Sequence, residues 1–313
     1  PPRKTPKECY EQIIADLTDA EKYAPDNDNS DRTKMTKTVA QAMLAKVYAE
    51  KEVQDYDKVI TYADKVIKTT GVELEDSYET LWGYDETTKD CLKRNTKEGI
   101  LEVHWTTGGG NWETWMFGRQ LDNWDFYFTW AKWITPSRDI ISDFEKEGDE
   151  IRKNQAIVYY ACTWSNYYPA SNYPFMYKLR SSYSNIYWIR LADIILMKAE
   201  AEAYKGNLDE SAKLVNQIRK RAKLKELTSD KTNSKEAMIE AVLHERRLEL
   251  AFEGERWFDL CRNNKVEKYL NGIDNRDKGR IKQVKQFDSN SYLLPIPQTA
   301  LDQNTNLEQN PGY

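Results

Sequence analysis

Long apolar runs are missing from this sequence of 313 residues. The best short run lies within residues 192–197, where Asp193 interrupts it, whereas a membrane-spanning helix needs about 20 apolar residues. The sequence therefore predicts no membrane-spanning helix. The chain also begins Pro-Pro-Arg-Lys, without an initiator methionine, a signal peptide or a lipidation cysteine, and we expect that this is not the natural start of a translated protein.

A charge excess of one sign is missing as well. Lys and Arg total 46 against 51 for Asp and Glu, so the net charge of −5 provides no field suited to a nucleic-acid backbone. The densest basic run, residues 219–225, closes an amphipathic helix, where cations complement the carbonyl end of the helix dipole. Nucleic acid is therefore not expected as a partner.

Cysteine and histidine are scarce, which limits disulfide and metal chemistry. The four cysteines are scattered without a C-x-x-C pair, and isolated small apolar residues are the favoured interpretation. His104 and His244 are the only histidines and form no H-E-x-x-H motif. Residues 26–31 begin like a calcium loop, but Asp31 and Lys37 occupy the positions that require Gly and Glu, so a solvated loop is favoured. We expect no metal and no cofactor.

Catalytic motifs are mostly absent. The sequence contains no G-x-S-x-G, no Walker lysine and no G-x-G-x-x-G spacing. Asp122 and Asp125 could serve as the acid and nucleophile of a glycosidase, since that chemistry requires only two carboxylates. Carboxylates are common in this chain, so a non-catalytic protein is the favoured interpretation.

Helical periodicity dominates both ends of the chain. It predicts a helix from Pro6 to Lys22 and a helix hairpin formed by residues 36–50 and 56–67. Residues 192–218 repeat this hairpin at a constant offset of 152 residues, as from Ala40 to Ala192. Small residues on the first helix and an acidic start to the second are typical of tetratricopeptide-like pairs. The predicted fold is mainly α, with tetratricopeptide-like helix hairpins forming a scaffold that carries a long irregular, aromatic-rich insertion.

This pattern divides one unit, residues 1–313, into three parts. We expect a helical scaffold over residues 1–70, an aromatic-rich ligand-binding insertion over 71–187, and a second helical part over 188–313. Residues 99–105 alternate enough to predict a short strand within the insertion.

Aromatic residues concentrate in the insertion, where six of the ten tryptophans fall between residues 105 and 133. Glycine and asparagine between them weaken any regular periodicity, so we expect some rings to be exposed. Exposed rings beside Asn, Asp and Arg suit sugars, although core packing remains open for each ring. The predicted ligand-binding residues are Trp112, Trp115, Arg119, Asn123, Trp124, Asp125 and Tyr127. An alternative site comprises Trp164, Tyr167 and Tyr168.

Residues 245–262 mix the apolar spacing of a helix with many charges. Arg246 lies in an apolar stripe with Val242 and Leu250, and a cation there must be paired. Glu249 and Glu253 follow one and two turns later, where side chains can meet. The sequence thus predicts a buried, structural ionic network that comprises Arg246, Arg247, Glu249, Glu253, Arg256 and Asp259.

This run closely resembles the carboxy-terminal signature of the SusD/RagB family of nutrient-binding outer-membrane lipoproteins. Further motifs similar to those of the family follow in the family's order, at residues 10–17, 136–144, 188–201, 216–222 and 294–313. Family members carry a signal peptide, a lipidated cysteine, further helices and part of the ligand site before the point that matches the start of this chain.

The resemblance implies capture without chemistry. Family members lie on the outer face of the outer membrane, lipid-anchored, as a lid over a TonB-dependent transporter of the SusC type, and they bind glycans or, in some members, peptides. The expected partners are therefore a SusC-like transporter and a glycan ligand. The alternatives are a peptide-binding member of the family, a surface glycosidase that uses Asp122 and Asp125, and a scaffold that binds only the transporter.

Overall fold

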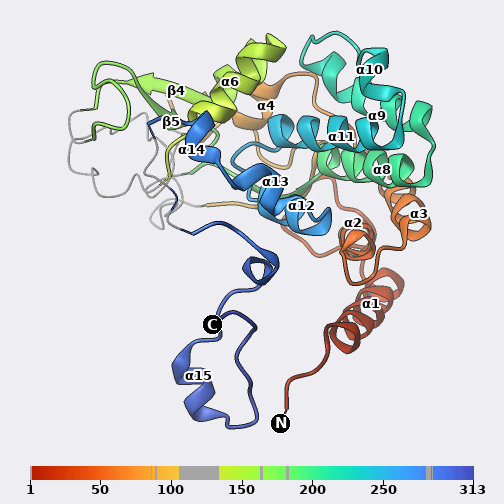
Figure 1. The fold of residues 1–313 in the computed structure, drawn as a ribbon. Helices are drawn as coiled ribbons and strands as arrows, with labels where there is room; N and C mark the ends of the chain where they lie inside the picture. Colours follow the sequence, from red (N-terminus) through yellow and green to blue (C-terminus); the bar gives the residue numbers. More distant parts are fainter. Residues whose placement is uncertain are drawn as a thin grey trace.

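The computed structural model describes residues 2–85, 87–88, 90–105, 134–162, 165–180, 183–279, 283 and 285–313. Helices make up most of its regular structure (Figure 1). Within these ranges, no helix combines the length and the hydropathy needed to cross a bilayer. The predicted ligand-binding residues between 112 and 127 lie outside the described residues.

Two helix pairs form the scaffold, as predicted. The first pair is α2 (Lys37–Ala49) and α3 (Tyr56–Ile67), and the second is α8 (Leu191–Lys205) and α9 (Leu208–Arg221). Each pair packs as a hairpin, and α3 also packs directly on α8. The two pairs are therefore neighbours in space, although the whole insertion separates them in the sequence.

Capping and small side chains explain why these segments form closely packed helices. The side chains of Thr36 and Asp55 cap α2 and α3 by accepting hydrogen bonds from backbone N–H groups of the first turn. Ala49 and Ala201, which correspond in the two repeats, are both buried in one cluster with Val59 and Met197. Small residues allow the helix axes to approach closely, so the alanines determine how the repeats stack.

The remaining helices extend this scaffold. Helix α1 (Pro6–Tyr23) begins at a capping box between Thr5 and Glu8 and packs on α2. Helix α11 (Lys235–Glu249) packs on α8 and α9 and adds Met238 and Val242 to the main core. The short helix α10 (Ser229–Thr232) precedes α11. Three short helices follow it, namely α12 (Arg256–Arg262), α13 (Val266–Leu270) and α14 (Ile273–Arg276).

The described part of the insertion is more regular than expected. Its helices are α4 (Tyr78–Trp82), α6 (Arg138–Glu147) and α7 (Glu150–Ala156). Its strands are β1 (Tyr84–Asp85), β2 (Asp90–Cys91), β3 (Gly99–Val103), β4 (Ile157–Tyr160), β5 (Tyr173–Met176) and β6 (Ile186–Arg190). Strands β3 and β6 pair antiparallel, and β6 continues directly into α8. This pair therefore joins the insertion to the scaffold.

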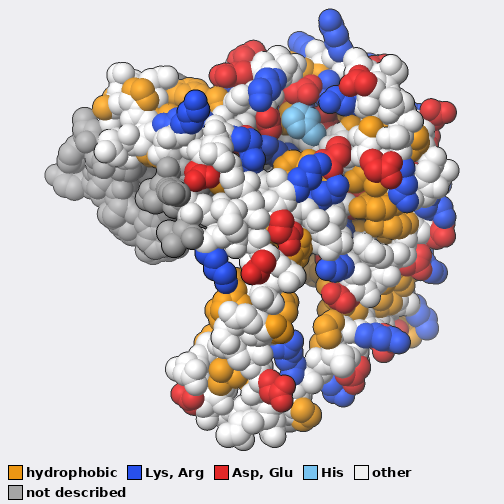
Figure 2. Space-filling view, in the orientation of Figure 1, with side chains coloured by type: hydrophobic (Ala, Val, Ile, Leu, Met, Phe, Trp, Pro, Cys, Tyr) orange, Lys and Arg blue, Asp and Glu red, His pale blue; other side chains and the backbone are white. Residues whose placement is uncertain are grey.

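The carboxy-terminal end forms an arm that leaves the body. It contains a short 3-10 helix (Ser289–Tyr292) and α15 (Gln298–Gln303). Figure 1 shows the arm and α1 projecting from the same end of the molecule, and Figure 2 shows an open slot between them. Arg3 donates a hydrogen bond of 2.7 Å to Asn310, which connects the two chain ends.

Candidate functional site

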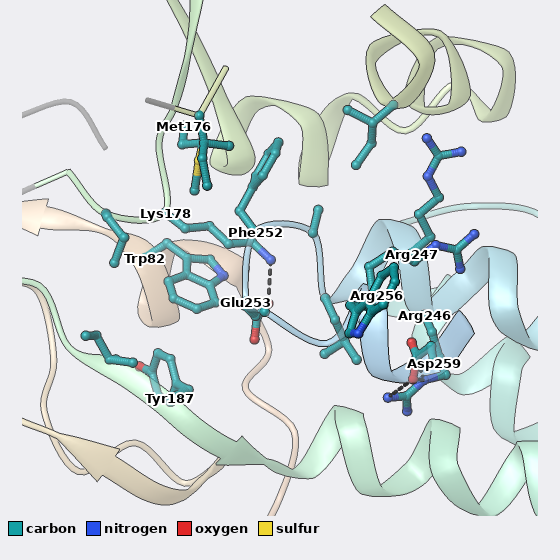
Figure 3. Close-up of a pocket in the computed structure, with 18 of the residues that line it drawn as sticks. Trp82, Met176, Lys178, Tyr187, Arg246, Arg247, Phe252, Glu253, Arg256 and Asp259 are labelled. Carbon is teal, nitrogen blue, oxygen red and sulfur yellow. Dashed lines mark hydrogen bonds and ion pairs between the residues drawn. The ribbon is translucent and has the colours of Figure 1, made fainter. Parts of the chain in front are cut away.

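A cavity of about 660 Å³ lies where the insertion meets the segment that connects α11 to α12. Figure 3 shows Trp82 and Lys178 on one side of this cavity and Arg246, Arg247 and Arg256 on the other. Its apolar and aromatic lining includes Trp82, Ile134, Met176, Trp188, Phe252 and Trp257. Size and lining together match the usual character of a small-ligand site, with apolar walls and a few polar groups.

The connection between α11 and α12 is shaped by two left-handed residues. Phe252 has φ +66° and Gly254 has φ +88°. A bulky side chain rarely adopts this conformation, and such residues occur where the surrounding structure holds a functional segment in place. The turn directs Glu253 inward, where it accepts hydrogen bonds from Arg190 Nε at 2.6 Å and from Lys178 Nζ at 2.5 Å.

Lys178 is a buried cation in the wall of the cavity. Its Nζ donates to Glu253 and to the backbone carbonyl of Glu249, and it lies 4.9 Å from the centre of the Trp82 ring. Burial lowers the pKa of Lys178, and the opposing charge of Glu253 does not fully offset this effect. The ring of Trp82 packs edge-on against Tyr187, which immobilises this wall.

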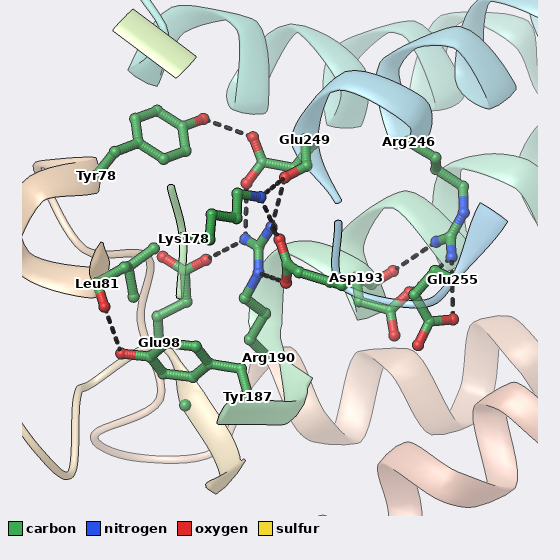
Figure 4. Close-up of polar contacts among 12 residues, drawn as sticks. Tyr78, Leu81, Glu98, Lys178, Tyr187, Arg190, Asp193, Arg246, Glu249 and Glu255 are labelled. Atoms are coloured by element: carbon green, nitrogen blue, oxygen red, sulfur yellow. Dashed lines mark hydrogen bonds and ion pairs between the residues drawn. The ribbon is translucent and has the colours of Figure 1, made fainter. Parts of the chain in front are cut away.

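A buried ionic cluster is centred on Glu249 (Figure 4), whose backbone carbonyl accepts the hydrogen bond from Lys178 of the cavity wall. Glu249 accepts hydrogen bonds from Arg190 at 2.7 Å, Arg221 at 2.6 Å, Arg152 at 3.1 Å and the Tyr78 hydroxyl at 2.6 Å. Burial raises the pKa of Glu249, but the three arginines outweigh burial and hold that pKa well below its ordinary value. The carboxylate is therefore charged, and it ties α11 to the insertion.

Arg246 belongs to a second buried cluster, in which Asp259 was a predicted member of the network and Asp193 was not. Its guanidinium contacts Asp259 on α12 at 2.9 Å and Asp193 on α8 at 2.8 Å. The expected pairing with Glu249 and Glu253 was wrong, because both of those carboxylates bind Arg190 instead. Helical spacing brings Arg246 and Glu249 onto neighbouring turns, but long-range partners determine which way each side chain points.

The other two arginines of the predicted network differ from each other. Arg247 forms ion pairs with Asp139 at 2.8 Å and with Asp143, both on α6. Arg256 donates to the carbonyl of Leu243 at 3.1 Å, and its guanidinium lies over the Tyr269 ring. Among the described residues, no carboxylate lies within ion-pair distance of Arg256.

The predicted ligand-binding residues Trp112, Trp115, Arg119, Asn123, Trp124, Asp125 and Tyr127 remain a prediction, because they lie outside the described residues. Ile134 and Thr135, the first described residues after position 133, line the cavity.

The described residues of the alternative aromatic site, Tyr167 and Tyr168, line a second hollow together with Arg138. Tyr167 and Tyr168 pack edge to face, and the Arg138 guanidinium lies over both rings. Tyr167 and Arg138 each bind the buried carboxylate of Asp277, at 2.5 and 2.9 Å. Trp164 lies outside the described residues. The polar atoms of this group bind one another, so the group favours a packing role.

Sequence reasoning missed three tryptophans of the cavity, namely Trp82, Trp188 and Trp257. Trp188 is 62% exposed on β6, between the buried residues Tyr187 and Ile189. Strand alternation explains this orientation, since neighbouring side chains point to opposite faces. The sequence of β6 is apolar or aromatic at neighbouring positions, so its pattern does not show which side chains point inward. In the part of the chain that the structure describes, no three His, Cys, Asp or Glu side chains gather to hold a metal ion.

Comparison with known proteins assigns the fold to a family. Residues 18–313 match the model of the SusD family. The chain belongs to the SusD family. This SusD-family chain is 28% identical to SusD-like protein P2 of Formosa agariphila, over 99% of its own length and 66% of that protein.

Solved structures agree with the SusD fold. A SusD superfamily protein from Parabacteroides distasonis superposes with a TM-score of 0.77 at 25% identity, over 99% of this SusD-family chain and 70% of that one. A SusD-like carbohydrate binding protein from Bacteroides vulgatus superposes with a TM-score of 0.65 at 19% identity. This match covers 84% of the present chain and 52% of the Bacteroides vulgatus chain. The chain thus spans 70% of the length of the Parabacteroides distasonis protein and 52% of the length of the Bacteroides vulgatus protein.

Proposed function

We propose that this protein is a non-catalytic binding protein that captures glycans and delivers them to a TonB-dependent transporter. The observation that carries the proposal is the exposed indole of Trp188, which lines a cavity of about 660 Å³ together with Trp82 and Trp257. Flat rings bind the C–H faces of a sugar at low cost in conformational entropy, while polar groups between them bind hydroxyls. Membership of the SusD family supports this reading.

The rigidity of the site also supports binding. Lys178, Glu253 and Arg190 are held by mutual ion pairs of 2.5 to 2.6 Å, so the cavity wall is already formed without a ligand. A preformed wall reduces the ordering cost of association. The described lining contains two carboxylates, Glu253 and Asp259, and both are engaged by arginines. Neither is free to act as a general acid or nucleophile.

A combined glycan and peptide array tests the proposal. We expect oligosaccharides to bind and peptides not to bind, and we expect the bound saccharide to be recovered unchanged after prolonged incubation. Chromatography of the recovered ligand measures turnover. Peptide binding alone would favour the peptide-binding alternative, and cleavage products would favour the glycosidase that uses Asp122 and Asp125.

We further propose that the protein acts on the outer face of the outer membrane, held there by a lipid anchor. Family membership supports this location and a SusC-like partner. Protease accessibility on intact cells and co-purification with a barrel-sized membrane protein are the direct measurements. Recovery of the protein from the periplasm, without such a partner, would contradict both statements.

A further inference from the structure

Four cations line the cavity, and three of them are neutralised by neighbouring carboxylates. Lys178 is paired with Glu253, and Arg246 is paired with Asp259 and Asp193. Arg247 is paired with Asp139 and Asp143. The fourth cation is Arg256, so any unbalanced charge in the described lining belongs to this residue.

Arg256 uses little of its hydrogen-bonding capacity. A guanidinium has five N–H donors, and that of Arg256 gives one hydrogen bond, to the Leu243 carbonyl at 3.1 Å. Burial, together with the nearby charge of Arg247, lowers the pKa of Arg256 to about 10. The side chain is still a cation at neutral pH. A partly buried cation is stabilised best by a contacting carboxylate or by several acceptors. Asp259 and Asp143 act on Arg256 only from beyond ion-pair distance, and the Tyr269 ring lies under its guanidinium, so the described residues provide no contacting carboxylate.

Arg180 is a buried arginine without an ion pair in the described part of the chain, and its N–H groups are hydrogen-bonded to uncharged acceptors. It also lacks a carboxylate partner among the described residues, and burial lowers its pKa to about 10. Three acceptors nevertheless surround it, namely the carbonyls of Tyr177 and Gln155 and the amide oxygen of Gln155, at 2.8 to 2.9 Å. Arg180 does not line the cavity. In contrast, the unused donors of Arg256 belong to a side chain that lines the cavity, where a ligand can reach it.

A second donor of the cavity wall has no partner either. Trp82 is 5% exposed, and its Nε1 has no hydrogen-bond acceptor among the described residues. This nitrogen is itself fully buried, and unpaired buried donors also occur among the described residues on Arg152 and Arg221 away from the cavity, so the Trp82 N–H does not by itself indicate a ligand. Trp82 and Arg256 lie on opposite sides of the cavity (Figure 3). Within the described lining, Arg256 is therefore the cation that offers unused donors to a ligand.

We propose that the glycan bound in this cavity is acidic and that Arg256 binds its anionic group, a carboxylate or a sulfate. Guanidinium and these anions match in geometry, because two parallel N–H groups meet two oxygens. The aromatic walls bind the sugar ring, and Arg256 makes the site prefer a glycan that carries a negative charge. This inference rests on the proposed glycan-binding function and names the class of glycan.

Paired ligands test the inference on the unmodified protein. The panel contains uronate oligosaccharides beside their carboxyl-reduced forms, and sulfated galactan oligosaccharides beside their desulfated forms. We expect the charged member of one pair to bind about tenfold tighter or more, the scale of a hydrogen bond to a charged group. The pair that shows this preference distinguishes a carboxylate from a sulfate. Equal affinity within every pair would overturn the inference and leave glycan binding intact.

Variants locate the effect at Arg256. Arg256→Gln is expected to bind both members of the pair with equal affinity, whereas Arg256→Lys retains part of the preference. Lys51→Gln is the matched control, since Lys51 also lies over a tyrosine ring but does not line the cavity. A preference that persists in Arg256→Gln would overturn the assignment. If no saccharide binds at all, the proposed function fails as well.

Discussion

Arg246 and Asp259 form a close ion pair between α11 and α12, in which the arginine Nε donates a bifurcated hydrogen bond of 2.9 Å to both carboxylate oxygens. Both side chains are almost fully buried, with exposures of 0% and 1%. Burial raises the pKa of Asp259, but Arg246 and Arg262 outweigh burial and lower it. The pair holds the two helices on either side of the turn that carries Phe252 and Glu253 into the cavity wall.

Removal of Arg246 is expected to destabilise the fold strongly. Arg246→Ala strands the buried carboxylates of Asp259 and Asp193, and breaking a buried pair in this way typically costs about 3 to 5 kcal/mol. Urea unfolding measures the loss. Arg276→Ala is the control, because Arg276 is 40% exposed and its ion pair with Asp139 should contribute about 1 kcal/mol or less. Unchanged stability together with lost ligand binding would assign Arg246 to the ligand instead.

Trp188 is expected to matter for binding and not for folding. Its indole is 62% exposed and lines the cavity, so Trp188→Ala should weaken glycan binding by about 1 to 2 kcal/mol, on the scale of aromatic contacts. Calorimetric titration provides the affinity, and thermal melting provides the stability. Phe258→Ala is the matched control, since Phe258 is 57% exposed but lies outside the cavity lining. Equal effects of the two variants would contradict a specific role for Trp188.

The aromatic segment makes a separate prediction. Trp112→Ala, Trp115→Ala and Trp124→Ala should each weaken binding by about 1 to 2 kcal/mol if the ring stacks on the ligand. Melting curves recorded on the same samples separate ligand contact from core packing. Should all three variants bind normally, the ligand contacts would belong to the described cavity alone.

Acid stability is expected to depend on Glu240. Burial raises the pKa of this carboxyl, but hydrogen bonds from Lys265, Lys268 and Tyr269 outweigh burial and lower the pKa to about 2. Its ordinary value is about 4.3. A lowered pKa stabilises the folded state above the unfolded value, and this contribution is lost as pH falls from about 4 to about 2. The free energy of unfolding of Glu240→Gln should therefore decrease less steeply over that interval.

Urea titrations of wild type and Glu240→Gln at neutral pH, pH 4 and pH 3 measure this difference. Glu11→Gln serves as the control, because Glu11 is exposed on α1 and its nearest cation lies 3.9 Å away. Identical pH profiles for wild type and Glu240→Gln would show that the contacts of Glu240 contribute nothing to acid stability.

The stacking of the two helix pairs can be tested at Ala63. This residue is fully buried in the cluster that also contains Ala192 and Ala199 of α8. Ala63→Leu adds volume where α3 packs on α8, and overpacking of this kind typically costs about 1 to 3 kcal/mol. Ala15→Leu, at an exposed position of α1, should change the midpoint of thermal unfolding little. A fully tolerated leucine at position 63 would mean that the two pairs separate easily.

The sequence by itself determined the helices, because their causes are local. Apolar spacing acts within one helix, and the 152-residue offset shows that one hairpin pattern occurs twice. They were sufficient to predict α2, α3, α8 and α9 and their pairing. The strand over residues 99–105 was predicted on the same basis and forms β3.

Only the tertiary structure decided which carboxylate each buried arginine binds. It also decided whether an aromatic side chain points into the core or towards the cavity. Arg246 lies one turn from Glu249, yet it binds Asp193, which is 53 residues away, because packing of α11 on α8 brings that carboxylate within 2.8 Å. Trp188 faces the cavity because pairing of β6 with β3 orients the strand. Arg256 was expected within the ionic network, and only the packed structure leaves its donors free. Such choices depend on contacts between distant segments, which no local pattern encodes.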